Sequence, residues 1–145
     1  MPPRMMTYSL RTSTPFASIG AVVGGLALLF TSCPAARAAD VGKEIATAAQ
    51  HAGYAAESTA IGMAYAHLHH TISCLVGPHG AGFDVKELNP CKELGNGAIP
   101  DTADTTRVKS LRAALAIAEA GLRSDDLDTV KRLGALAAAE IKKAE

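Results

Sequence analysis

The fold class is decided by the carboxyl-terminal segment of residues 105–144, which reads TTRVKSLRAALAIAEAGLRSDDLDTVKRLGALAAAEIKKA. Alanine, the strongest helix former, is abundant here, and the apolar residues recur at steps of three and four. This spacing builds two apolar stripes, each of which predicts an amphipathic helix. The first stripe consists of Val108, Leu111, Leu115, Ala118 and Leu122, and the second of Leu127, Val130, Leu133, Ala137 and Ile141.

A break between the two stripes predicts an antiparallel helical hairpin. Gly121 suits the C-terminal cap of the first helix, and Ser124 suits the N-cap of the second. Acidic residues follow Ser124, where the helix dipole favours them, and Lys142 and Lys143 lie at the opposite end of the second helix.

The segment of residues 40–75 is also rich in alanine and predicts either one long helix or a second hairpin. Gly53 and the polar residues that follow it resemble Gly121 and the acids that follow that glycine. A second hairpin would give four helices, and one long helix would give three. In both cases the prediction is an all-α fold, an up-down helical bundle of three or four helices.

The loop of residues 77–104 separates the two helical segments. It holds enough glycine and proline to forbid a regular element of any length. Its breakers are Pro78, Gly80, Gly82, Pro90, Gly95, Gly97 and Pro100.

The amino-terminal 38 residues are typical of a signal peptide. Arg4 and Arg11 precede an uncharged run of residues 17–30, which is shorter than the roughly 20 apolar residues of a membrane-spanning helix. The small residues Ala36 and Ala38 then suit a signal peptidase, which predicts cleavage between Ala38 and Ala39. The expected mature chain, residues 39–145, is one helical domain without a transmembrane span, located in the periplasm or secreted. Cys33 offers an alternative, because a lipoprotein could carry its lipid there.

Cleavage changes the charge of the protein. The whole chain has 14 basic and 14 acidic residues, and the leader removes Arg4, Arg11 and Arg37 but no acid. The mature chain therefore carries 11 basic residues and a net charge of −3. A mildly acidic domain without basic clusters is not expected to bind nucleic acid.

Cys74 and Cys91 are the two cysteines that remain after cleavage. In an oxidising compartment such a pair predicts a disulfide, which would close the loop. A two-thiolate metal or redox site is the alternative.

Histidines crowd the end of the amino-terminal helical segment. At about 100° per residue, Met63, His67, His70 and Cys74 fall on one face of a helix. His67 and His70 have the i, i+3 spacing with which helical residues share one metal ion, and a thioether from Met63 would favour Cu(I). The loop histidine His79 is a further candidate ligand, because a disulfide would return the loop to this helix end.

Each candidate also has a structural interpretation. His67 and His70 could instead hydrogen-bond the loop and hold it in place, and Met63 at a core-facing position would fill the core. His69 lies on another face, where a solvated surface residue is expected. His51 shares that other face, so it should contribute little to metal affinity. With a second hairpin it would also lie near a helix C-terminus, where the helix dipole favours an imidazolium.

The chain resembles the small metal-binding helical-bundle proteins of the bacterial periplasm. The resemblance rests on His51, His67, His69 and His70, and on hairpin signals at Gly53 and Gly121. It implies a four-helix bundle that sequesters copper or another divalent ion. The carboxyl-terminal hairpin contains no histidine, so at most one site is implied.

The function predicted from the sequence is binding of a transition metal, Cu or Zn, with non-covalent haem a weaker possibility. The alternative is a structural or interaction module that contacts an envelope protein through the disulfide loop. Catalysis is not predicted, because the sequence has no Gly-x-Ser-x-Gly elbow and no acid, base and nucleophile set is visible by spacing. The glycine-rich piece of the loop is not a phosphate-binding loop, and the lack of a Cys-x-x-Cys-His motif excludes covalent haem attachment by the usual motif.

Overall fold

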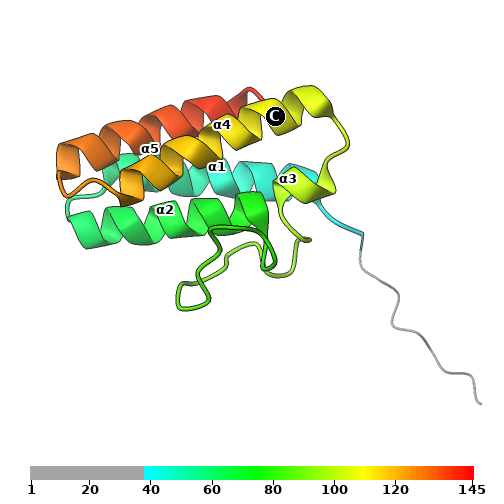
Figure 1. The fold of residues 1–145 in the computed structure, drawn as a ribbon, viewed down its shortest axis with the longest axis horizontal. Coiled ribbons are helices and arrows are strands. Elements are labelled where there is room, and N and C mark those ends of the chain that lie inside the picture. The colour runs from blue at the N-terminus through cyan, green and yellow to red at the C-terminus, as the bar shows by residue number, and fades with distance from the viewer. Residues whose placement is uncertain (1–37) are drawn as a thin grey trace, which may run out of the picture. The chain divides into compact units, whose positions relative to one another are not determined.

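Four long helices and one single helical turn form the part of the protein that the structure, a computed structural model, describes: residues 38–145 (Figure 1). The long helices are α1 (Val41–Glu57), α2 (Ile61–Val76), α4 (Thr105–Leu122) and α5 (Leu127–Lys142), and the turn is α3 (Ala98–Asp101). No strand occurs in this range. The predicted signal peptide and Cys33 lie outside the described residues, apart from Ala38.

The four long helices make an up-down bundle. In Figure 1, α1 and α2 form one hairpin and α4 and α5 form the other. Helix α1 packs against α2 and α5, and α4 packs against α2 and α5, so each long helix has two antiparallel neighbours. The all-α prediction is confirmed, and the four-helix alternative is the one observed.

Small side chains allow the helices to approach closely. Half of the buried apolar residues are alanines, and the larger ones include Leu68, Leu111 and Ile141, all fully buried. A Cβ atom added to Gly134 of α5 would lie 3.0 Å from the Ala52 carbonyl oxygen of α1. Glycine therefore brings these two helices close together.

The hairpin turns differ from the predicted ones. Gly53 lies inside α1, which continues to Glu57, and Gly121 lies inside α4. Gly121 serves packing, because a Cβ atom there would lie 2.5 Å from Leu68 Cδ1. The N-cap of α5 is Asp126, whose carboxylate accepts a hydrogen bond from Thr129 N at 2.8 Å, and not Ser124. The second carboxylate of the predicted acidic run, two residues after Ser124, caps the helix in place of the serine.

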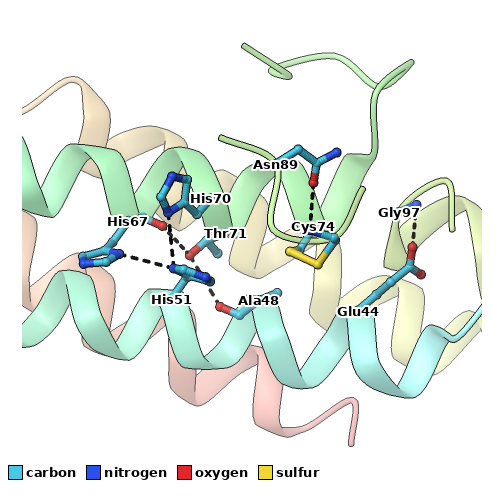
Figure 2. The surroundings of a disulfide bond; sticks show 10 residues. Glu44, Ala48, His51, His67, His70, Thr71, Cys74, Asn89 and Gly97 are labelled. Atoms are coloured by element: carbon cyan, nitrogen blue, oxygen red, sulfur yellow. Dashed lines mark hydrogen bonds between the residues drawn. A yellow bond between two sulfur atoms is a disulfide. The ribbon is translucent and has the colours of Figure 1, made fainter. Parts of the chain in front are cut away.

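The loop between α2 and α4 is fixed to the end of the bundle. A Cβ atom on Gly77 would lie 1.6 Å from the Asn96 carbonyl oxygen, so the start of the loop touches the segment just before α3 through its backbone. The fully buried Glu44 of α1 accepts a hydrogen bond from Gly97 N at 2.9 Å (Figure 2). Burial raises the pKa of Glu44, and the nearby Asp101 adds to this effect, while the Gly97 bond opposes it.

The predicted disulfide is present. Cys74 at the end of α2 is bonded to Cys91, with their Cα atoms 5.2 Å apart, and both residues are buried. Asn89 Oδ1 accepts a hydrogen bond from Cys91 N at 2.9 Å. Among the described residues, no helix is long and apolar enough to cross a membrane.

Candidate metal centre

Three histidines from two helices converge at the α1–α2 interface (Figure 2). His51 lies on α1, and His67 and His70 lie on α2. The Nδ1 atom of His51 is 3.2 Å from His67 Nδ1 and 3.4 Å from His70 Nδ1. One nitrogen from each ring can be chosen so that all three lie within 4.8 Å of one another, and all three residues are partly buried. This cluster could hold a metal ion.

The hairpin between α1 and α2 creates this convergence. Its turn is centred near Thr59, so antiparallel packing brings residue 51 opposite residue 67. Thr71, which follows His70, fixes the spacing of the helices from a buried position. Its hydroxyl lies 2.9 Å from the His67 carbonyl oxygen on its own helix and 3.4 Å from the Ala48 carbonyl oxygen on α1.

The two short contacts of His51 cannot both be good hydrogen bonds. An imidazole nitrogen carries either one hydrogen or one lone pair in the ring plane. If His51 Nδ1 is protonated, it can donate to His67 or to His70; if it is not, both neighbours compete for one lone pair. A cation placed among the three nitrogens would use a lone pair of each ring and remove this conflict.

Tyr54 covers part of the cluster. Its ring centroid lies 5.7 Å from that of His51 and 5.3 Å from that of His67. The Tyr54 hydroxyl accepts a hydrogen bond from Gln50 Nε2 at 2.7 Å, which holds the ring in this position.

A surface depression of about 300 Å³ borders the cluster on the His67 side. It is lined by Tyr54, Glu57, Ser58, Thr59, Met63 and His67. The predicted metal ligand Met63 is therefore beside the cluster, but its side chain is 52% exposed, so the prediction that it fills the core is wrong.

The environment of the cluster disfavours protonated imidazole. Burial lowers the pKa of His51 to about 4, with further lowering by the charges of His70 and His67. Burial also lowers the pKa of His70, as does His67, while the carboxylate of Glu87 in the disulfide loop acts in the opposite direction. At neutral pH both rings are uncharged and their nitrogens are available as ligands.

The lowered pKa values predict that the metal-free protein loses stability in mild acid. An unfolded histidine takes up a proton near pH 6.5, whereas folded His51 does so only near pH 4. Stability should therefore fall as the pH drops from about 7 to about 4, by roughly 1–2 kcal/mol for this partly exposed group. The loss should be complete below the folded pKa.

Thermal unfolding of metal-free protein across this pH range measures the effect. His51→Ala is the control, because this variant lacks the imidazole of His51 but keeps every carboxylate of the wild type, including Glu44. The difference in melting temperature between the two proteins should change by roughly 5–10 °C over this range. If the melting temperatures of the two proteins changed with pH in parallel, the lowered pKa of His51 would be contradicted.

The other predicted residues lie apart from the cluster or take another role. His79 is exposed in the loop and does not belong to the group. Cys74 is in the disulfide, one helical turn beyond His70, and is not available as a ligand. His69 is partly buried, with a buried Nδ1 atom that has no hydrogen-bond partner, so the prediction of a solvated residue is not met.

His51 is the residue that the sequence analysis missed. Helical periodicity places it on another face from His67 and His70, and a hairpin turn at Gly53 would place it near a helix end. It lies at the centre of the cluster because α1 continues beyond Gly53. Nor do His67 and His70 hold the loop through hydrogen bonds: within the described chain, the contacts of their ring nitrogens go to His51.

No protein-family model matches the chain, and neither the curated proteins nor the solved structures contain a significant match.

Proposed function

We propose that the chain binds one transition-metal ion, zinc or copper, through His51, His67 and His70. The convergence of their ring nitrogens supports this most directly. In a tetrahedral site with metal–nitrogen distances of about 2.0–2.1 Å, two ligand nitrogens are about 3.3 Å apart. The two Nδ1 separations of His51, 3.2 and 3.4 Å, fit that edge length.

The chemistry of the ligands favours zinc, copper, nickel or iron over hard cations. Neutral imidazole binds these metals well, and calcium and magnesium prefer oxygen ligands. Haem is not proposed, since the three nitrogens converge on a space the size of one ion. The protein would act as a binding protein, with the disulfide loop as part of its scaffold.

The direct test is metal titration of protein prepared without a histidine tag. Zinc or copper should bind with a stoichiometry of one per chain. Absence of uptake at micromolar metal would refute the proposal, and uptake of several ions would point to surface histidines instead.

We also propose that the protein is exported, to the periplasm or beyond. Support comes from the sequence of the leader and from the disulfide, which is typical of proteins outside the reducing cytoplasm. Mass spectrometry of exported protein should identify Ala39 as the first residue. A lipid-modified Cys33 at the amino terminus would contradict release by cleavage after Ala38.

A second candidate function is contact with an envelope protein through the disulfide loop. The observation in its favour is the exposure of two large apolar side chains on this loop, Val85 at 84% and Leu88 at 67%. Replacing both with serine would weaken such a contact and leave metal uptake unchanged, which separates the two functions.

A further inference from the structure

The histidine cluster supplies three ligands, and a tetrahedral metal takes four. Within residues 38–145 no other histidine, cysteine, aspartate or glutamate joins the group. The two described cysteines are consumed by the disulfide. Structural zinc sites fill all four positions with protein ligands, whereas sites with three protein ligands keep a water or a substrate in the fourth position.

The surroundings of the cluster show where a fourth ligand could enter. Tyr54 packs against His51 and His67, and the depression of about 300 Å³ lies next to the His67 ring. A water molecule occupies about 30 Å³ in the liquid, so this space accepts several atoms. Met63 lines the depression without filling it, because half of its surface is exposed.

The charge of the loaded site favours an anion as the exchangeable ligand. Neutral imidazoles leave the full charge of a divalent ion uncompensated, unlike carboxylate or thiolate ligands. Glu57 at the edge of the depression is the only acidic residue in its lining and opposes this attraction in part.

Resting on the metal site proposed above, we infer that the bound metal keeps a fourth coordination position, which opens into the depression beside His67 and takes a water molecule or a small anion. The site then has the ligand pattern of an exchangeable centre rather than of a closed structural one.

Cobalt(II) is a suitable probe, since its visible absorption reports coordination number and ligand exchange. The full chain should take up one cobalt ion, and azide should then shift the visible bands in a saturable manner. A cobalt-loaded protein whose spectrum does not respond to azide would overturn the inference while leaving the metal site intact. Failure of cobalt, zinc and copper to bind would instead refute the proposed function, and the inference with it.

Two variants test the position and direction of the opening. Met63→Leu removes the thioether. If the Met63 sulfur were the fourth ligand, azide would shift the cobalt spectrum of this variant and not that of the wild type. We expect instead that azide shifts both spectra equally. Thr59→Trp should fill the depression and weaken azide binding by about tenfold or more, with cobalt affinity unchanged. Thr106→Trp, at an exposed position on α4, is the matched control. Equal azide affinity in all these proteins would show that the metal does not open into the depression.

Discussion

Replacement of His51 by alanine is expected to lower metal affinity by about a hundredfold or more, which exceeds the 10- to 100-fold typical of residues that only support a ligand. His51 contacts both other rings, so its loss removes the nitrogen at the centre of the site. The double variant His67→Ala/His70→Ala should abolish stoichiometric binding. Helical content should persist in both, because alanine is a better helix former than histidine.

His69→Ala and His79→Ala are the matched controls, and each should bind metal as tightly as wild type. Isothermal titration with zinc, and a competition assay for copper, measure the affinities. If His51→Ala retained wild-type affinity, the i, i+3 pair on α2 would be the site by itself. If His79→Ala lost affinity, the loop would have to move on metal binding.

The sequence identified two of the three histidines of the site because helical periodicity is local. His67 and His70 lie on one helix, and their relation requires only the 100° rotation per residue. His51 lies on the other helix of the hairpin, and the position of the turn decides which residue of α2 lies opposite it. With a turn near Gly53, residue 51 would lie near a helix end; with the observed turn centred near Thr59, it faces His67. Glycine costs only about 1 kcal/mol relative to alanine inside a helix, so Gly53 does not end α1.

Met63 illustrates a second limit of periodicity. Helix α2 carries one stripe with Met63, His67 and His70, and another whose buried residues are Ala64, Leu68, Ile72 and Leu75. The second stripe lies roughly 100° further round the helix and faces the bundle axis. The first lies along the edge of the α1–α2 interface, where burial depends on the neighbouring helix. The sequence shows both stripes, but only tertiary packing decides which becomes the core.

Loss of the disulfide is expected to lower the melting temperature by on the order of 10 °C or more, because closing a loop with a sequence separation of 17 stabilises the fold by about 3 kcal/mol in the chain-entropy model. The bond links Cys91 to the end of α2, and the loop it holds covers the same end of the bundle as Glu44 and Gly97.

Thermal unfolding with and without a thiol reductant measures this effect, and the double variant Cys74→Ala/Cys91→Ala provides the control. Reductant should destabilise the wild type and leave the double variant unchanged, which separates loss of the bond from other effects of the reagent. Metal affinity should change little in the double variant, since neither sulfur is a ligand and the three histidines are positioned by α1 and α2. Two free thiols in protein recovered under non-reducing conditions would contradict the disulfide itself. A large loss of metal affinity in a double variant that remains folded would instead show that the loop, whose Glu87 carboxylate acts electrostatically on His70, helps to hold the site in its binding geometry.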